Sequence, residues 1–231
     1  MVEFFPPGET SISQIDAWKL LRIMAEFVNG FETFTGKGPF ISIFGGTRFK
    51  RNHPYYKLAC EITAAITKKG FSIITGAGPG IMEAANKTCQ ENNQASAGLI
   101  PDLPYELEPN EYLDPKLSPR FRYFFVRKVM FVRYAQGFVF LPGGYGTLDE
   151  FFEVVSLIQT KKIPPTPVFL VGSEYWKGFV QWLKTEPVKE HCIFKEECRL
   201  FTITDDPNKI ANGLLESYHE RVKIHDVEEN I

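Results

Sequence analysis

The chain has 231 residues, of which 44% are hydrophobic and 23% charged, so it is long enough and apolar enough for one globular domain with a sizeable core. A formal net charge of −2 without long basic runs argues against a nucleic-acid partner, and charges interrupt every apolar stretch well before the length of a membrane span. The four cysteines form neither a CxxC pair nor a zinc-like Cys–His spacing, and no signal peptide is apparent, so we expect free thiols, no bound metal and a cytoplasmic location.

In chain order, short apolar runs alternate with longer amphipathic stretches. Ser11-Ile-Ser-Gln14 indicates a capping box that opens a helix over about residues 11–29, and a glycine-rich linker is expected from Gly30 to Gly38. Buried strands are expected at residues 40–44, 71–75, 97–100, 137–141, 167–171 and 200–203. Helices are expected at about 53–69, from 81, at 120–134, from Thr147 to about 160, and after each of the last two strands. The proline- and glutamate-rich segment 101–119 lacks periodicity and is the candidate for a mobile or interface loop.

The alternation of strand, turn and helix sets the fold class. The strands are too apolar to have a solvated face, which is typical of a parallel sheet covered by helices on both sides. No repeat, low-complexity tract or shift in composition marks a second domain. The sequence therefore predicts an α/β protein with a single doubly wound Rossmann-like domain over residues 1–231, with the N-terminal helix packed on it.

Three glycine-rich turns follow predicted strands, where open parallel sheets bind their ligands. They are Gly45-Gly46, Gly76 to Gly80, and Gly143-Gly-Tyr-Gly146. None is followed by the Gly-Lys-Ser/Thr of a P-loop. The second turn begins like a dinucleotide fingerprint, but Ile81 stands where the third glycine belongs, so that match is weak.

The third turn is the most specific, because it comes directly before a predicted helix. Free N–H groups at a helix N-terminus attract anions, and glycines leave them accessible, so a phosphate is the expected occupant. We expect Glu150 to lie in the first turn of this helix. Thr147-Leu-Asp-Glu150 also fits a capping box, so Glu150 could serve either a ligand or its own helix.

The helix expected before this turn carries an arginine among apolar residues. Arg127 falls on one stripe with Arg120, Tyr123, Met130 and Tyr134. A guanidinium in such surroundings needs a partner, which could be a structural carboxylate or a bound anion. The helix that follows Glu150 is apolar nearly all round, which favours burial in the core or against a second copy of the chain.

Together these residues resemble the LOG (Lonely Guy) family of cytokinin-activating nucleoside 5′-monophosphate phosphoribohydrolases, often labelled lysine decarboxylases. The family pattern Pro-Gly-Gly-x-Gly-Thr-x-x-Glu matches Pro142 to Glu150. The Arg-Lys of the family's Arg-Lys-x-x-Met helix matches Arg127-Lys128, and Met130 stands one residue before the pattern's methionine. The resemblance covers about residues 40–182 and looks like the longer, bacterial type. The first turn departs from it, reading Gly45-Gly-Thr-Arg48 where Gly-Ser-Ala-Arg is expected.

The resemblance implies hydrolysis of AMP, or of an N6-modified AMP, to a free base and ribose 5-phosphate, without a cofactor. It also implies a homo-oligomer, a dimer or larger, with the site near the dimer interface. On this basis Glu150 would stabilise an oxocarbenium-like ribose or orient water, and Arg127 would contact the substrate and assist the leaving base. The candidate catalytic residues are thus Glu150 and Arg127. The candidate substrate-binding residues are Gly45, Gly46, Gly78, Gly80, Met82, Lys128, Gly143, Gly144, Tyr145, Gly146 and Thr147. The alternative from another class is a non-catalytic sensor or carrier of AMP-type nucleotides.

Overall fold

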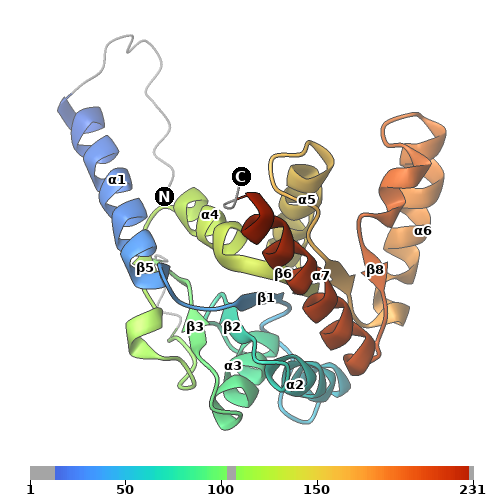
Figure 1. Ribbon diagram of the computed structural model, residues 1–231, viewed down its shortest axis with the longest axis horizontal. Coiled ribbons are helices and arrows are strands. Elements are labelled where there is room, and N and C mark those ends of the chain that lie inside the picture. The colour runs from blue at the N-terminus through green and yellow to red at the C-terminus, as the bar shows by residue number, and fades with distance from the viewer. Residues whose placement is uncertain (1–13, 103–107, 229–231) are drawn as a thin grey trace.

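The computed structural model describes residues 14–102 and 108–228 and shows an α/β fold (Figure 1). One sheet contains six strands in the order β3-β2-β1-β6-β7-β8, and all neighbouring strands in it are parallel. Their bounds are β1 Phe40–Phe44, β2 Ser72–Thr75, β3 Ser96–Gly98, β6 Ala135–Phe140, β7 Val168–Leu170 and β8 Thr202–Ile203. This is the strand order of a doubly wound Rossmann sheet, which confirms the predicted fold class.

Helices cover both faces of the sheet (Figure 1). One face packs against α1 (Gln14–Phe34), α4 (Phe124–Tyr134), α5 (Tyr145–Gln159) and α6 (Ser173–Lys189). The other face packs against α2 (Pro54–Thr67), α3 (Ile81–Glu91) and α7 (Pro207–Glu228). Strand β1 supplies both cores, because its side chains alternate between the faces and all five of its residues are buried.

The strand order creates a crevice between β1 and β6. From β1 the chain moves outward to β2 and β3, and it then returns to β6 on the other side of β1. The connections that leave these two neighbouring strands therefore run in opposite directions, and they open a space beyond the carboxyl ends of the strands. All three glycine-rich turns follow strands β1, β2 and β6 at this edge.

Helix α4 is shorter than the sequence predicts. It begins at Phe124, whereas residues Arg120–Phe121 form the short strand β5, which pairs with β4 (Ile100–Pro101). The Glu26 carboxylate of α1 accepts hydrogen bonds from the N–H groups of Arg122 and Tyr123, at 3.0 and 3.1 Å. These tertiary contacts keep Arg122 and Tyr123 out of the helix, so the expected helical stripe loses Arg120 and Tyr123.

Helix α1 is longer at its end than the sequence predicts. It continues to Phe34, so the first part of the linker expected from Gly30 to Gly38 is helical. Gly30 does not end the helix, because it lies where α1 crosses α4: a Cβ there would be 2.7 Å from the sulfur of Met130. This glycine permits the close approach of two helices. The predicted capping box at Ser11 lies mostly outside the described residues.

Smaller differences concern the strand after α3 and the long loop. The expected strand 97–100 is divided between β3 and β4. Within the loop, residues 103–107 lie outside the described part, and the remainder contains one short 3₁₀ helix, η1 (Pro115–Leu117). A second 3₁₀ helix, η2 (Lys195–Arg199), precedes β8. Among the helices that the structure describes, none combines the length and the apolar character that a membrane crossing needs.

Candidate active site

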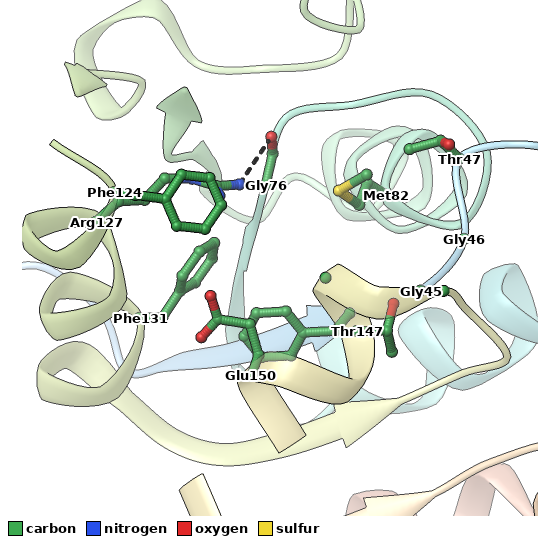
Figure 2. Close-up of a pocket in the computed structure, with 13 residues that line it drawn as sticks. Gly45, Gly46, Thr47, Gly76, Met82, Phe124, Arg127, Phe131, Thr147 and Glu150 are labelled. Carbon is green, nitrogen blue, oxygen red and sulfur yellow. Dashed lines mark hydrogen bonds between the residues drawn. The ribbon is translucent and has the colours of Figure 1, made fainter. Parts of the chain in front are cut away.

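A cavity of about 240 Å³ lies at the carboxyl ends of β1, β2 and β6 (Figure 2). Its walls come from the three glycine-rich turns, from the first turns of α3 and α5, and from α4. The lining residues are Phe44, Gly45, Gly46, Thr47, Gly76, Met82, Phe124, Arg127, Phe131, Gly144, Gly146, Thr147 and Glu150. Segments from across the chain thus converge at the crevice that the strand order opens.

The N-terminus of α5 forms one end of this cavity. The helix begins at Tyr145, two residues before the expected start, and the N–H groups of Thr147 and Leu148 both donate to the carbonyl of Gly144. In the described part of the chain, the N–H groups of residues 143–146 have no acceptor. Free N–H groups and the positive end of the helix dipole together make an anion site.

Glu150 lies one turn further along α5 and is 4% exposed. The capping-box alternative is wrong, because the Thr147 N–H is bonded to Gly144 and α5 has no side-chain cap. The Oε2 atom of Glu150 is buried without a hydrogen-bond partner among the described residues. A buried, unpaired carboxylate is unfavourable for folding, so its presence beside an anion site points to a role with a ligand.

The surroundings of Glu150 also change its acidity. Burial raises the pKa of this carboxyl from 4.5 to about 7, while the positive charges of Lys128 and Arg127 oppose that rise. Near neutral pH the group is therefore divided between its protonated and ionised forms. Such a carboxyl can give or accept a proton at physiological pH, as general acid–base groups do.

Arg127 enters the cavity from α4 and is held by the backbone. Its Nε donates to the carbonyl of Leu99 at 2.7 Å, and its Nη2 donates to the carbonyl of Gly76 at 3.4 Å (Figure 2). The rings of Phe124 and Phe131 lie 5.3 and 5.0 Å from the guanidinium carbon. Among the described residues, two carbonyls and two aromatic rings contact the guanidinium of Arg127, and no carboxylate is hydrogen-bonded to it. The structural carboxylate is thus not its partner, and a bound anion stays a prediction.

The electrostatics of Arg127 follow from this burial. Desolvation lowers the pKa of its guanidinium from its ordinary value to about 10, and the negative charge of Glu150 acts in the opposite direction. The group remains charged at neutral pH. It therefore supplies a fixed positive charge and hydrogen-bond donors beside Glu150, not a mobile proton.

The turn after β2 must pass close to Arg127. A Cβ at Gly76 would lie 2.4 Å from the Arg127 Nη2 and 2.9 Å from the sulfur of Met82, so glycine leaves the space that the guanidinium occupies. Ala77 follows with a φ of 66°, in the left-handed region. This turn needs support, because a non-glycine residue there is under strain.

Asn86 provides that support from α3. It is fully buried; its Oδ1 accepts from the Thr75 hydroxyl at 2.6 Å and from the Asn110 amide at 3.0 Å. Its own amide donates to the Ser96 hydroxyl at 2.9 Å. Asn110 in turn donates to the carbonyls of Ala77 and Gly78. The network thus ties the turn after β2 to α3, β3 and the long loop.

Replacing this amide is expected to destabilise the protein. Asn86→Ala removes the buried hydrogen bonds that its side chain makes with Thr75, Ser96 and Asn110, so we expect the free energy of unfolding to fall by about 3 kcal/mol. Urea denaturation followed by circular dichroism measures the change. Asn29→Ala, at an exposed position of α1, is the control and should change stability by less than about 0.5 kcal/mol. Equal stability of the two variants would contradict the importance of the network.

The cavity brings together eight of the residues predicted for the site: Gly45, Gly46, Met82, Arg127, Gly144, Gly146, Thr147 and Glu150. The other five are absent from its lining: Gly78, Gly80, Lys128, Gly143 and Tyr145. Lys128 forms ion pairs with Glu153 and, at 3.0 Å, with Asp149, so it joins α4 to α5. The Tyr145 side chain is almost fully exposed.

Five lining residues were not among the predicted ones: Phe44, Thr47, Gly76, Phe124 and Phe131. Phe124 and Phe131 stand three residues before and four after Arg127, so helical spacing alone places them on its face. Thr47 and Gly76 belong to the first and second glycine-rich turns, which the sequence predicts, but the sequence does not show that these two residues line the cavity. In the described ranges, no group of three or more His, Cys, Asp or Glu side chains could hold a metal ion.

Known proteins have sequences similar to this chain. Residues 82–214 match the family described as possible lysine decarboxylase. The chain is 26% identical over 187 residues to the probable cytokinin riboside 5′-monophosphate phosphoribohydrolase LOG4 of Oryza sativa subsp. japonica, which covers 79% of this chain and 80% of that protein. It is 27% identical over 192 residues to the cytokinin riboside 5′-monophosphate phosphoribohydrolase LOG2 of Arabidopsis thaliana, covering 80% and 85%.

Solved structures share the fold. The molybdenum cofactor carrier protein of Chlamydomonas reinhardtii superposes with a TM-score of 0.53 at 19% identity, over 78% of this chain and 99% of that one. The molybdenum cofactor binding protein of Rippkaea orientalis gives a TM-score of 0.55 at 18% identity, over 80% and 99%. Both of these proteins are described as binding or carrying a cofactor, so this fold alone does not decide between a catalyst and a carrier.

Proposed function

The chain belongs to the LOG (Lonely Guy) family, the possible lysine decarboxylases, and from that membership we propose that it hydrolyses the N-glycosidic bond of nucleoside 5′-monophosphates. The products are a free base and ribose 5-phosphate, and the proposed substrates are AMP or an N6-modified AMP, as in cytokinin nucleotides. One observation carries the proposal: a buried, unpaired carboxylate, Glu150, lies one helical turn from the free N–H groups at the start of α5.

The proposed binding mode follows from the two ends of the cavity. The 5′-phosphate binds the N–H groups of Gly144 and Gly146, which line the cavity where the helix dipole favours negative charge. One turn of helix advances about 5.4 Å, so the ribose of a phosphate held there reaches the Glu150 carboxylate. The base then extends toward Arg127 and the aromatic rings of Phe124 and Phe131.

The proposed chemistry needs one carboxylate and one cation. The bond between C1′ and the base nitrogen breaks, its electron pair leaves with the base, and positive charge develops on the ribose, where ionised Glu150 stabilises it. The oxygen of a water molecule bonds to C1′; Glu150 orients this water, whose proton is passed to the base. Arg127 donates hydrogen bonds to the departing base. Asp149 is no second catalytic acid here, because it is half exposed and paired with Lys128.

A lysine decarboxylase activity is not part of the proposal. Pyridoxal phosphate forms a Schiff base with a lysine, and no lysine is among the described residues that line the cavity. Lys128, which follows Arg127 in the sequence, forms ion pairs with Asp149 and Glu153.

The test is the release of free base. Purified protein is incubated with a panel of nucleoside monophosphates, including AMP and N6-isopentenyl-AMP, and the free bases are quantified by chromatography. Release of adenine or an N6-modified adenine supports the proposal. Binding of these nucleotides in calorimetry without any release of base would favour the alternative, a sensor or carrier of AMP-type nucleotides, and would overturn the hydrolase assignment.

We also propose that the protein is a homo-oligomer whose interface lies beside the site. Large apolar side chains are exposed next to the cavity on α4 and α5, and along the outer side of α1: Trp18, Leu21, Met24, Val28, Phe124, Phe125, Val129 and Phe152. So much exposed apolar surface on neighbouring helices is typical of a subunit contact. Sedimentation equilibrium should give the mass of a dimer or a larger assembly, and a monomer at micromolar concentration would contradict this.

A further inference from the structure

One hydrogen bond to the phosphate-binding turn comes from outside the cavity. The Tyr175 hydroxyl donates to the carbonyl of Gly143 at 2.6 Å. Tyr175 belongs to the first turn of α6, beyond β7, and it is absent from the residues that line the cavity. The bond therefore joins α6 to the turn before α5, and the proposed chemistry does not use it.

The direction of this bond fixes the direction of an N–H group. In a trans peptide the carbonyl oxygen and the N–H of the next residue point in opposite directions, and the bond between Gly143 and Gly144 is trans. The Gly143 oxygen points toward Tyr175, outside the cavity. The Gly144 N–H therefore points to the other side, where Gly144 lines the cavity.

Packing restrains this peptide on one side only. A Cβ at Gly143 would lie 2.1 Å from the Oγ1 of Thr147, whereas a Cβ at Gly144 would meet no atom within 4 Å. Glycine also has wide conformational freedom, which makes rotation of a peptide between two glycines easy. If this peptide turned over, a carbonyl oxygen would face the anion in place of an N–H group.

Tyr175 itself is well placed to act as a fixed donor. Tyr175 stands three residues after Gly172, whose φ of 90° lies in the left-handed region. A Cβ at Gly172 would lie 2.8 Å from the ring of Pro142, so α6 starts directly against the turn. The neighbouring Trp176 is buried and donates to the carbonyl of Val171 at 2.9 Å, which anchors the first turn of α6.

We propose that Tyr175 is a positioning residue that acts through Gly143: its hydroxyl orients the Gly144 N–H toward the phosphate of the ligand. This role of Tyr175 rests on the proposed function, because it takes the bound anion to be the 5′-phosphate of a nucleotide. It predicts that loss of the hydroxyl weakens the binding of phosphate while the chemistry at Glu150 continues.

The test compares Tyr175→Phe with the unchanged protein. Isothermal titration with ribose 5-phosphate, which has no glycosidic bond to cleave, should show a Kd about fivefold higher in the variant, as expected for one lost hydrogen bond. With AMP, KM should rise by a similar factor and kcat should stay within about twofold. Tyr218→Phe, which removes a hydroxyl from α7 on the other face of the sheet, is the control and should change neither value.

The outcomes separate this proposal from the proposed function. If Tyr175→Phe binds ribose 5-phosphate as tightly as the unchanged protein, or if kcat falls while KM stays constant, the positioning role is overturned, whether or not AMP is hydrolysed. If no base is released from any nucleotide but the variant still loses affinity for ribose 5-phosphate, the hydrolase assignment fails and the role of Tyr175 stands. If the unchanged protein does not bind ribose 5-phosphate, the phosphate site and the role of Tyr175 fall together.

Discussion

Glu150→Gln is expected to lower kcat for base release from AMP by about 10²- to 10³-fold, while KM changes little. The amide has nearly the same size and shape as the carboxyl, but it cannot carry the negative charge that stabilises the ribose. The measurement is steady-state release of adenine. Asp149→Asn is the matched control: it removes the neighbouring carboxylate of the same helix, which is half exposed, and should retain activity within about threefold. A Glu150→Gln protein that kept most of its activity would overturn the catalytic role.

The same substitution should make the protein more stable at alkaline pH. Because the pKa of Glu150 in the folded protein is about 7 and its ordinary value is 4.5, the folded state binds more protons than the unfolded state between these values. The stability of the unchanged protein therefore falls as the pH rises from 4.5 to 7. Above pH 7, Glu150→Gln should unfold with a free energy higher by on the order of 2 to 3 kcal/mol, and near pH 4 this difference should vanish. Urea denaturation at several pH values checks the sign.

Arg127→Met is expected to lower kcat/KM by about 100-fold and to shift the pH dependence of the rate. Base release should rise with pH through about 7 in the unchanged protein, because Glu150 acts in its ionised form. The positive charge of Arg127 lowers the pKa of Glu150, so its removal should move this rise to higher pH. Rates measured from pH 5 to 9 give both the loss and the shift.

The control for this variant is Arg133→Met, an exposed arginine in the last turn of the same helix. It should leave the rate and its pH dependence unchanged. Loss of activity in Arg127→Met without any shift of the profile would show that the two groups are not coupled. Circular dichroism checks that the variant folds, because the carbonyls of Leu99 and Gly76 each lose a donor.

Much of the fold could be predicted because the signals were local. Most predicted strands are short apolar runs that end in a turn, and each of the six predicted positions overlaps a strand of the structure. The prediction of a buried strand is wrong for β8, where Thr202 is exposed and Ile203 is half-buried. The errors arose where distant contacts decide. Glu26 holds Tyr123 outside α4, and Met130 requires a glycine at position 30 inside α1; neither contact leaves a mark in the nearby sequence. That residues 1–231 form one domain in the cytoplasm stays a prediction.

Part of the candidate site could be predicted because its residues lie close together in the sequence. The third glycine-rich turn stands just before Glu150, so their motif is visible there. The choice between a ligand and a helix cap for Glu150 depended on where α5 begins, and a shift of two residues decided it against the cap. The backbone partners of Arg127 lie on other segments, so no sequence pattern could name Leu99 or Gly76.

The two ends of the cavity are built from different materials. The anion end consists of main-chain N–H groups, whose positions depend on where strands and helices begin and not on side-chain identity. Side chains line other parts of the cavity, among them those of Met82, Phe124 and Phe131. Substitutions of these side chains can therefore change the group that is accepted beside the anion while the anion end stays intact. The fold can thus keep one anion site, formed by the main chain, while substitutions of the lining side chains change which group binds beside it.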